Sequence, residues 1–190
     1  RAWTYAELFD ASRRLALALA TRFTPGERVV VWAPNIPEWV LMEYACGMAG
    51  LVLVTANPSF QVGEIRYVLE QSRAVALFTV NEYRGNPMAK IAAKAVSDNA
   101  AIRECTDLND SSALYAEGDH PADLPTVTSV DAAQIQYTSG TTGFPKGAVL
   151  SHGSLINNAR LFCDRKGVGP HSVWANFMPL FHTAGRVTVT

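Results

Sequence analysis

Cysteine is scarce in this sequence, and its three copies, Cys46, Cys105 and Cys163, stand far apart. They provide neither the paired spacing of a zinc site nor the dense framework of a disulfide-rich secreted domain. Each is expected to act as a small buried hydrophobe. This cysteine usage favours a reducing compartment, and we therefore expect a cytoplasmic protein.

A charge excess of one sign and long apolar runs are missing as well. Sixteen basic residues against 17 acidic ones leave a net charge of −1, so nothing suggests a nucleic-acid partner. No apolar run approaches the length of a membrane-spanning helix, and we expect no transmembrane segment. Hydrophobic residues make up 48% of the chain and charged residues 17%, which is typical of a globular protein with a substantial core.

Strands alternate with helices along the sequence. A capping box at Thr4 and Glu7 predicts the first helix, and short β-branched runs predict buried strands. This alternation predicts an α/β fold, doubly wound, with a mainly parallel sheet and helices on both faces. The predicted strands are 28–32, 51–55, 74–79, 101–105, 132–137, 147–150 and 173–177, and later helices are expected from 34–37 to about 50, around 62–69, from 87 to about 97 and at 155–164.

Composition also suggests how the chain is divided. Residues 1–105 are expected to form a βαβ subdomain, and the acidic, proline-containing stretch 106–131 a surface excursion. Residues 132–190 are expected to begin a second, nucleotide-binding subdomain. The chain starts at Arg1 and ends in an apolar run, so we expect it to be part of a longer protein. Missing strands and covering helices would then favour self-association of this part.

One loop concentrates the groups that bind phosphate. Glycines let backbone N–H groups approach a ligand, hydroxyls add donors, and a lysine adds a charge suited to phosphate. The spacing matches neither the P-loop nor G-x-G-x-x-G. A flexible surface loop is the alternative, but apolar runs flank this stretch on both sides. The predicted polyphosphate ligands are Thr138, Ser139, Gly140, Thr141, Thr142, Gly143, Lys146 and Gly147.

The segment 137–147 resembles the signature loop of the adenylate-forming (AMP-binding) enzymes, most closely that of acyl-CoA synthetases and fatty-acid–CoA ligases. Residues 176–185 resemble the next motif of that family, and 57–64 and 33–39 resemble earlier ones. The resemblance covers most of the chain and identifies it as the N-terminal part of such an enzyme. It implies ATP-dependent conversion of a small carboxylic acid, fatty or aryl, to an acyl-adenylate. Pyrophosphate is released, and a thioester with CoA then forms.

The resemblance also implies roles for individual residues. Lys146 would stabilise the reacting phosphates as a catalytic residue, and Thr138 would lie near Mg²⁺. His182 would be catalytic beside the carboxylate, with Phe181 at the acyl pocket. For His182 a structural role in the core or in a turn is the alternative. His152, within 151–154, is interpreted as part of a helix cap rather than as a catalyst.

Two other functions remain open. An adenylation domain that loads a carrier protein would activate the acid identically and differ only in the acceptor. A non-catalytic nucleotide-binding or scaffold fragment would retain ATP binding without forming an adenylate.

Overall fold

The centre of the fold is made by three buried, β-branched strands. The computed structural model describes residues 2–119, 123–138 and 145–186. In it, β1 (Arg28–Trp32) pairs in parallel with both β2 (Val52–Ala56) and β3 (Ala74–Thr79). Every residue of β2 and nearly every residue of β1 and β3 is buried, as expected for strands covered on both faces.

Three further strands complete a six-stranded sheet in the order β4-β3-β1-β2-β5-β6. β4 (Glu104–Asp107) runs parallel to β3, and β5 (Ala132–Thr138) runs parallel to β2. β6 (Lys146–Ser151) is antiparallel to β5 and lies at the edge of the sheet. The predicted mainly parallel α/β sheet is confirmed.

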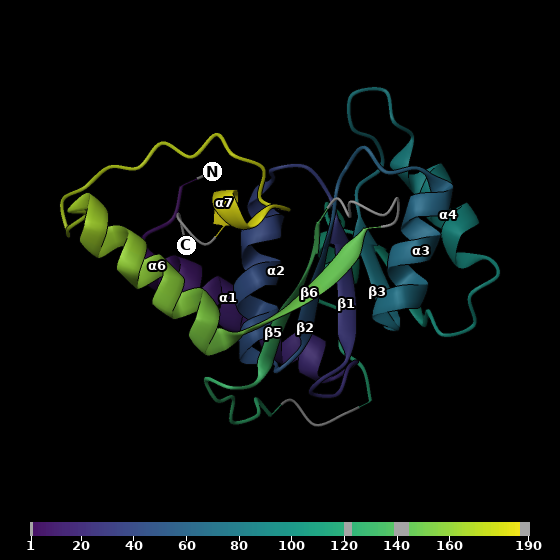
Figure 1. Cartoon of the computed structure of the whole chain (residues 1–190). Coiled ribbons are helices and arrows are strands. Elements are labelled where there is room, and N and C mark those ends of the chain that lie inside the picture. Colours follow the sequence, from purple (N-terminus) through teal and green to yellow (C-terminus); the bar gives the residue numbers. More distant parts are fainter. Residues whose placement is uncertain (1, 120–122, 139–144, 187–190) are drawn as a thin grey trace.

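The helices cover the two faces of this sheet in pairs (Figure 1). α1 (Tyr5–Ala20) and α2 (Pro37–Met48) pack together on one face, and α3 (Val62–Ser72) and α4 (Met88–Val96) on the other. α5 (Ser111–Leu114) is a single turn, α6 (His152–Lys166) follows β6, and α7 (Thr183–Arg186) ends the described chain. The predicted capping box opens α1, where the Glu7 N–H donates to Thr4 Oγ1 at 3.2 Å and the Thr4 N–H to Glu7 Oε2 at 2.7 Å.

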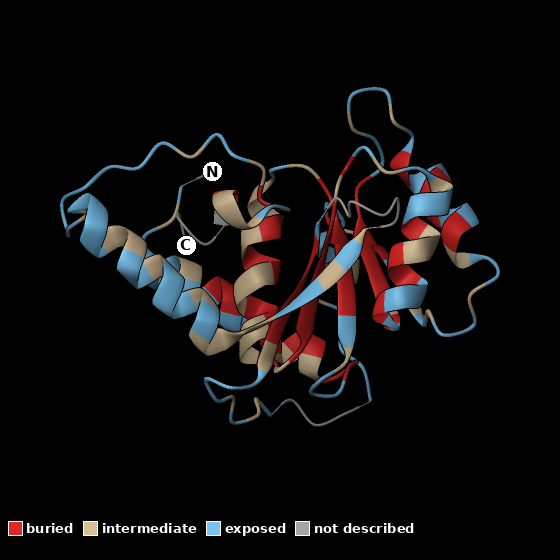
Figure 2. Ribbon diagram, viewed as in Figure 1, coloured by how far each residue is buried: buried red, intermediate tan, exposed pale blue. Residues whose placement is uncertain are grey.

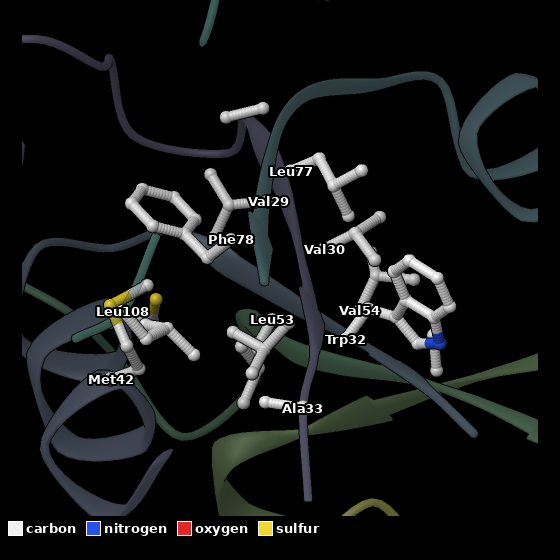
Figure 3. Packing of buried hydrophobic residues seen from close by; sticks show 14 of the residues in the cluster. Val29, Val30, Trp32, Ala33, Met42, Leu53, Val54, Leu77, Phe78 and Leu108 are labelled. Carbon is white, nitrogen blue, oxygen red and sulfur yellow. The ribbon is translucent and has the colours of Figure 1, made fainter. Parts of the chain in front are cut away.

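The core lies between these layers and is continuous across the sheet (Figures 2 and 3). Trp32, Trp39 and Phe78 are its largest fully buried side chains, and Figure 3 labels Trp32 and Phe78. The indole N–H of Trp32 donates to the backbone oxygen of Asn57 at 2.8 Å, which satisfies the one polar atom of that ring. The central strands therefore end at fixed positions, and the loops that follow their carboxyl ends start from a rigid base.

Several sequence-based expectations were wrong in detail. The segment 173–177, predicted as a strand, pairs with no strand among residues 2–119, 123–138 and 145–186, and Val173 is 97% exposed. A β-branched run forms a strand only where a neighbouring strand accepts and donates its hydrogen bonds. Only Cys46 among the three cysteines is buried, because Cys105 lies on the edge strand β4 and Cys163 on the exposed helix α6. β4 also begins three residues later than predicted.

The predicted division into subdomains stays a prediction. Strands from both predicted units, β2 and β5, pair within one sheet in this chain. The excursion contains the end of β4 and α5, which Asp110 caps through the N–H groups of Ser112 and Ala113. Among the described residues, no helix combines the length and apolar character needed to span a membrane.

Candidate nucleotide site

The predicted phosphate loop joins the two arms of the β5–β6 hairpin. Thr138, the last residue of β5, stands opposite Lys146, the first residue of β6, and both are exposed. Thr138 Oγ1 lies 3.5 Å from the backbone oxygen of Lys146. Exposed polar side chains at the carboxyl end of a buried parallel strand are well placed to meet a ligand. The remaining predicted phosphate ligands, Ser139, Gly140, Thr141, Thr142 and Gly143, lie outside the described residues.

Both arms of the hairpin are held by helix α3. The Tyr67 hydroxyl donates to the backbone oxygen of Pro145 at 2.9 Å. The Tyr137 hydroxyl donates to Gln71 Oε1. The two tyrosine rings pack edge to face, with centroids 6.4 Å apart. Sequence reasoning missed Tyr67 and Gln71, because their spacing along α3 only indicates a shared helix face and not what that face contacts.

The environment of Tyr137 keeps its hydroxyl protonated. Burial, reinforced by the neighbouring Tyr67, raises the pKa of Tyr137 to about 12. At neutral pH the phenol therefore remains a hydrogen-bond donor.

Gly147 lets the return arm pass close to β5. A Cβ at this position would come within 2.8 Å of Ile135 Cγ2 and within 3.3 Å of Gln71 Oε1 and Tyr137 Cζ. The predicted role of Gly147 was to approach a ligand. That role stays a prediction. The structure adds a second constraint, because Gly147 also passes against β5 and α3, where only glycine fits without displacing its neighbours.

The segment around His182 is held near the carboxyl ends of β1 and β5. Asn35, which follows β1, donates through Nδ2 to the Met178 oxygen at 2.9 Å and accepts from the Leu180 N–H at 2.8 Å. Gln136 Nε2 donates to the Phe181 oxygen at 3.0 Å. Gln136 is buried and lies two residues before Thr138 on β5. One strand therefore supports both the start of the phosphate loop and the backbone of Phe181.

His182 itself is exposed, and Phe181 packs against the edge of the core. His182 Nδ1 accepts from the Ala184 N–H at 3.2 Å, so one ring nitrogen orders the turn into α7. Its predicted role beside a carboxylate stays a prediction, and the structural alternative stays open.

A separate cavity of about 1250 Å³ opens between α2 and α6. Met48, Leu155 and Trp174 contribute apolar wall, and Glu43 and His152 contribute polar groups. None of Thr138, Lys146, Phe181 and His182 lines it. This cavity is therefore distinct from the candidate phosphate site.

The described residues offer few ligands for a magnesium ion. They contain no group of three histidine, cysteine, aspartate or glutamate side chains that could hold a metal. Mg²⁺ at nucleotide sites keeps most of its ligands as water and phosphate oxygens and takes few from the protein. The exposed hydroxyl of Thr138 fits as one such ligand.

Comparison with known proteins identifies the family. The sequence matches the AMP-binding enzyme family over residues 1–190, and the chain belongs to that family. The feruloyl-CoA synthase of Amycolatopsis sp is 35% identical over 96% of this chain and 35% of its own length. The mitochondrial medium-chain acyl-CoA ligase ACSF2 of Danio rerio is 28% identical over 97% of this chain and 35% of its own length.

A solved structure agrees with the fold. The o-succinylbenzoate CoA synthetase MenE of Bacillus subtilis, in complex with its acyl-adenylate intermediate, superimposes with a TM-score of 0.82 and 26% identity. The match covers 98% of this chain and 36% of MenE. Another structure of MenE holds ATP and a magnesium ion. The chain therefore spans little more than a third of the length of these relatives.

Proposed function

We propose that the whole protein to which this chain belongs is an AMP-forming acid–CoA ligase. It activates a small carboxylic acid with ATP and then transfers the acyl group to CoA. The observation that carries this proposal is the exposed Lys146 opposite Thr138 at the end of the β5–β6 hairpin, in a chain of the AMP-binding enzyme family.

The chemistry explains why such a loop is needed. A carboxylate oxygen attacks the α-phosphorus of ATP, and the bond from that phosphorus to the bridging oxygen of the β-phosphate breaks, releasing pyrophosphate. The attacking carboxylate and the triphosphate of ATP are both anionic, and negative charge grows on the leaving pyrophosphate. A lysine and backbone donors that are already in place lower this barrier by positioning and charge stabilisation. We assign this role to Lys146 and the loop that precedes it.

The second half-reaction forms the thioester. The CoA sulfur attacks the acyl carbon, the carbon–oxygen bond to AMP breaks, and the thiol proton passes to solvent or to a base. The names of the relatives support CoA, rather than a carrier protein, as the acceptor. They also support a fatty or aryl acid as the substrate. A cytoplasmic location stays part of this proposal.

Thr138 would hold Mg²⁺ at the start of the loop, and His182 and Phe181 would face the acid. The ion would neutralise phosphate charge when bound. Gln136 and Asn35 support this arrangement because they fix the backbone on which Phe181 and His182 are carried.

The test is acid-dependent ATP–pyrophosphate exchange by the whole protein against a panel of medium-chain and aryl carboxylic acids. We expect Lys146→Ala to lower exchange by about a hundredfold, as the loss of one charge-stabilising donor does in other enzymes. His182→Ala should impair the response to acid more than ATP binding. Lys90→Ala, on the exposed face of α4, is the matched control and should exchange normally.

Three outcomes would contradict the proposal. Exchange at the wild-type rate by Lys146→Ala would contradict the role in charge stabilisation that we assign to Lys146 and its loop. ATP binding by the wild-type protein without exchange for any acid would favour a nucleotide-binding scaffold. AMP release that requires a carrier protein and ignores CoA would favour the adenylation-domain alternative.

A further inference from the structure

Helix α3 presents two side chains to the hairpin that carries Lys146, one to each arm. Tyr67 and Gln71 are four residues apart and therefore lie on the same face of α3. Tyr67 donates to the Pro145 oxygen at 2.9 Å, and Gln71 accepts from the Tyr137 hydroxyl. Pro145 comes directly before Lys146. Tyr137 pairs with Gly147, which comes directly after Lys146, so both contacts lie next to the lysine.

The Tyr67 contact acts on the peptide group that leads into Lys146. The carbonyl of Pro145 and the N–H of Lys146 belong to one planar unit with little rotational freedom. A hydrogen bond that holds this carbonyl therefore also orients the start of Lys146. The lysine side chain is a long, flexible stem, so the direction in which its backbone points determines how often its charge reaches a given position.

The residue after Lys146 is confined as well. Gly147 lies so close to Ile135, Gln71 and Tyr137 that a side chain there would overlap with the first of them. Gln71 is in turn held by Tyr137, whose ring packs against that of Tyr67. Lys146 thus stands between two backbone units that α3 and β5 hold in place, while its own side chain is exposed.

We propose that Tyr67 and Gln71 are positioning residues for Lys146, and that α3 aligns its charge with the phosphates of the nucleotide. This rests on the proposed function, in which Lys146 acts on ATP. Tyr67 contacts the backbone next to Lys146, and Gln71 contacts the facing strand β5, so neither is placed on the nucleotide itself.

The first experiment compares single variants of the whole protein. Tyr67→Phe removes one hydroxyl and keeps the ring, and Gln71→Leu removes the acceptor at an exposed position. Each should lower kcat/KM for ATP in pyrophosphate exchange by roughly three- to tenfold, the range expected for one lost hydrogen bond. The KM for the acid should stay at the wild-type value, and the unfolding temperature should fall by no more than about 4 °C, as expected for one hydrogen bond. Tyr5→Phe, at a tyrosine that is 93% exposed, is the matched control and should change nothing.

The second experiment asks whether the effect passes through Lys146. In a double-mutant cycle, Tyr67→Phe should cause no further loss once Lys146→Ala is present, because the group being positioned is gone. Additive losses, or an equal rise in the KM for the acid, would show that Tyr67 only stabilises the fold and would overturn the proposal. Wild-type kinetics in both Tyr67→Phe and Gln71→Leu would overturn it too.

The outcomes also separate this proposal from the function on which it rests. An impaired Lys146→Ala with unaffected α3 variants would refute the positioning role and leave the proposed function intact. A fully active Lys146→Ala would refute the role of the lysine itself, and the positioning proposal would fall with it. If Tyr67→Phe fails to fold, Gln71→Leu carries the same comparison.

Discussion

Gly147 stands where the return arm of the hairpin passes close to both β5 and α3. The space for a Cβ is already taken by Ile135 Cγ2, which is 2.8 Å from the ideal position. Such a distance forces a shift of the arm or of Ile135, which is buried in the core. The close fit of this one residue therefore couples the position of Lys146 to the packing of β5.

At this scale we predict that Gly147→Ala lowers the free energy of unfolding by about 1–3 kcal/mol, the usual cost of overpacking. Urea-induced unfolding, followed by tryptophan fluorescence, measures it. Gly63→Ala is the matched control, since a Cβ at Gly63 in α3 meets nothing within 4 Å. The control should be as stable as the wild type or more stable, because alanine favours a helix. Equal stability of the two variants would contradict the steric argument.

Among the elements, α6 depends on its first turn. Ser151 caps it through the Ser154 N–H, and Gly167 ends it in the left-handed conformation at φ 66°. None of its residues is fully buried. Its start is tied to the chain before β5, where the N–H groups of His152 and Gly153 donate to the oxygens of Asp131 and Ser129. The prediction that residues 151–154 cap a helix is confirmed.

His152 makes the stability of this attachment depend on pH. Burial lowers the pKa of His152 below its ordinary value of 6.5, although the nearby Asp131 opposes the shift. Its Nε2 atom is buried and has no hydrogen-bond partner among the described residues. The unfolded chain therefore takes up a proton more readily than the folded chain. The contribution of His152 to the free energy of unfolding is fully present above pH 6.5. It is lost as the pH falls through the pKa of the unfolded chain towards the lower pKa of the folded chain.

At the scale of this element we predict that His152→Gln flattens the decline in stability between about pH 7.5 and about pH 5.5. Denaturant unfolding across this range, for wild type and variant, measures the difference in slope. Carboxylates such as Asp131, whose pKa is lowered by its hydrogen bonds to Thr128, titrate below this range and should affect both proteins equally. Identical slopes would show that His152 is not the group responsible.

The whole molecule is unevenly covered. Most of the buried residues belong to the strands and helices of residues 2–119, whereas α6 and the segment after it show little burial (Figure 2). Large apolar side chains accumulate on this later part, and apolar patches of this kind mark surfaces that meet other protein. The exposed residues concerned are Ile156, Leu161, Val173, Trp174, Phe177 and Met178, and Val149 on the preceding strand β6 is exposed as well.

For the whole chain we predict self-association through this apolar surface when the 190 residues are studied alone. Sedimentation velocity over a range of concentrations should show a concentration-dependent increase in mass. Replacing Val173 by Thr and Phe177 by Ser, at side chains 97% and 86% exposed, should reduce it. Tyr5→Ser, at an equally exposed aromatic on α1, should not. A monomer at every concentration would contradict the prediction.

The sequence by itself determined those features that depend on neighbouring residues in the chain. The limits of β1 and β3, the capping box of α1 and the alternation of strands and helices all follow from local propensity and hydrophobic pattern. The strands on either side of the glycine-rich loop, predicted at 132–137 and 147–150, are also found, within one residue at each end, because short apolar runs flank the loop.

Only the tertiary structure decided the features that need a partner distant in sequence. The segment 173–177 has strand propensity but pairs with no strand in the part of the chain that the structure describes. Tyr67 and Gln71 lie more than 60 residues before the hairpin that they hold, and nothing in their spacing indicates this contact. Hydrogen bonds and packing of this kind exist only after the chain has folded, because the groups that make them are brought together by the order of strands in the sheet.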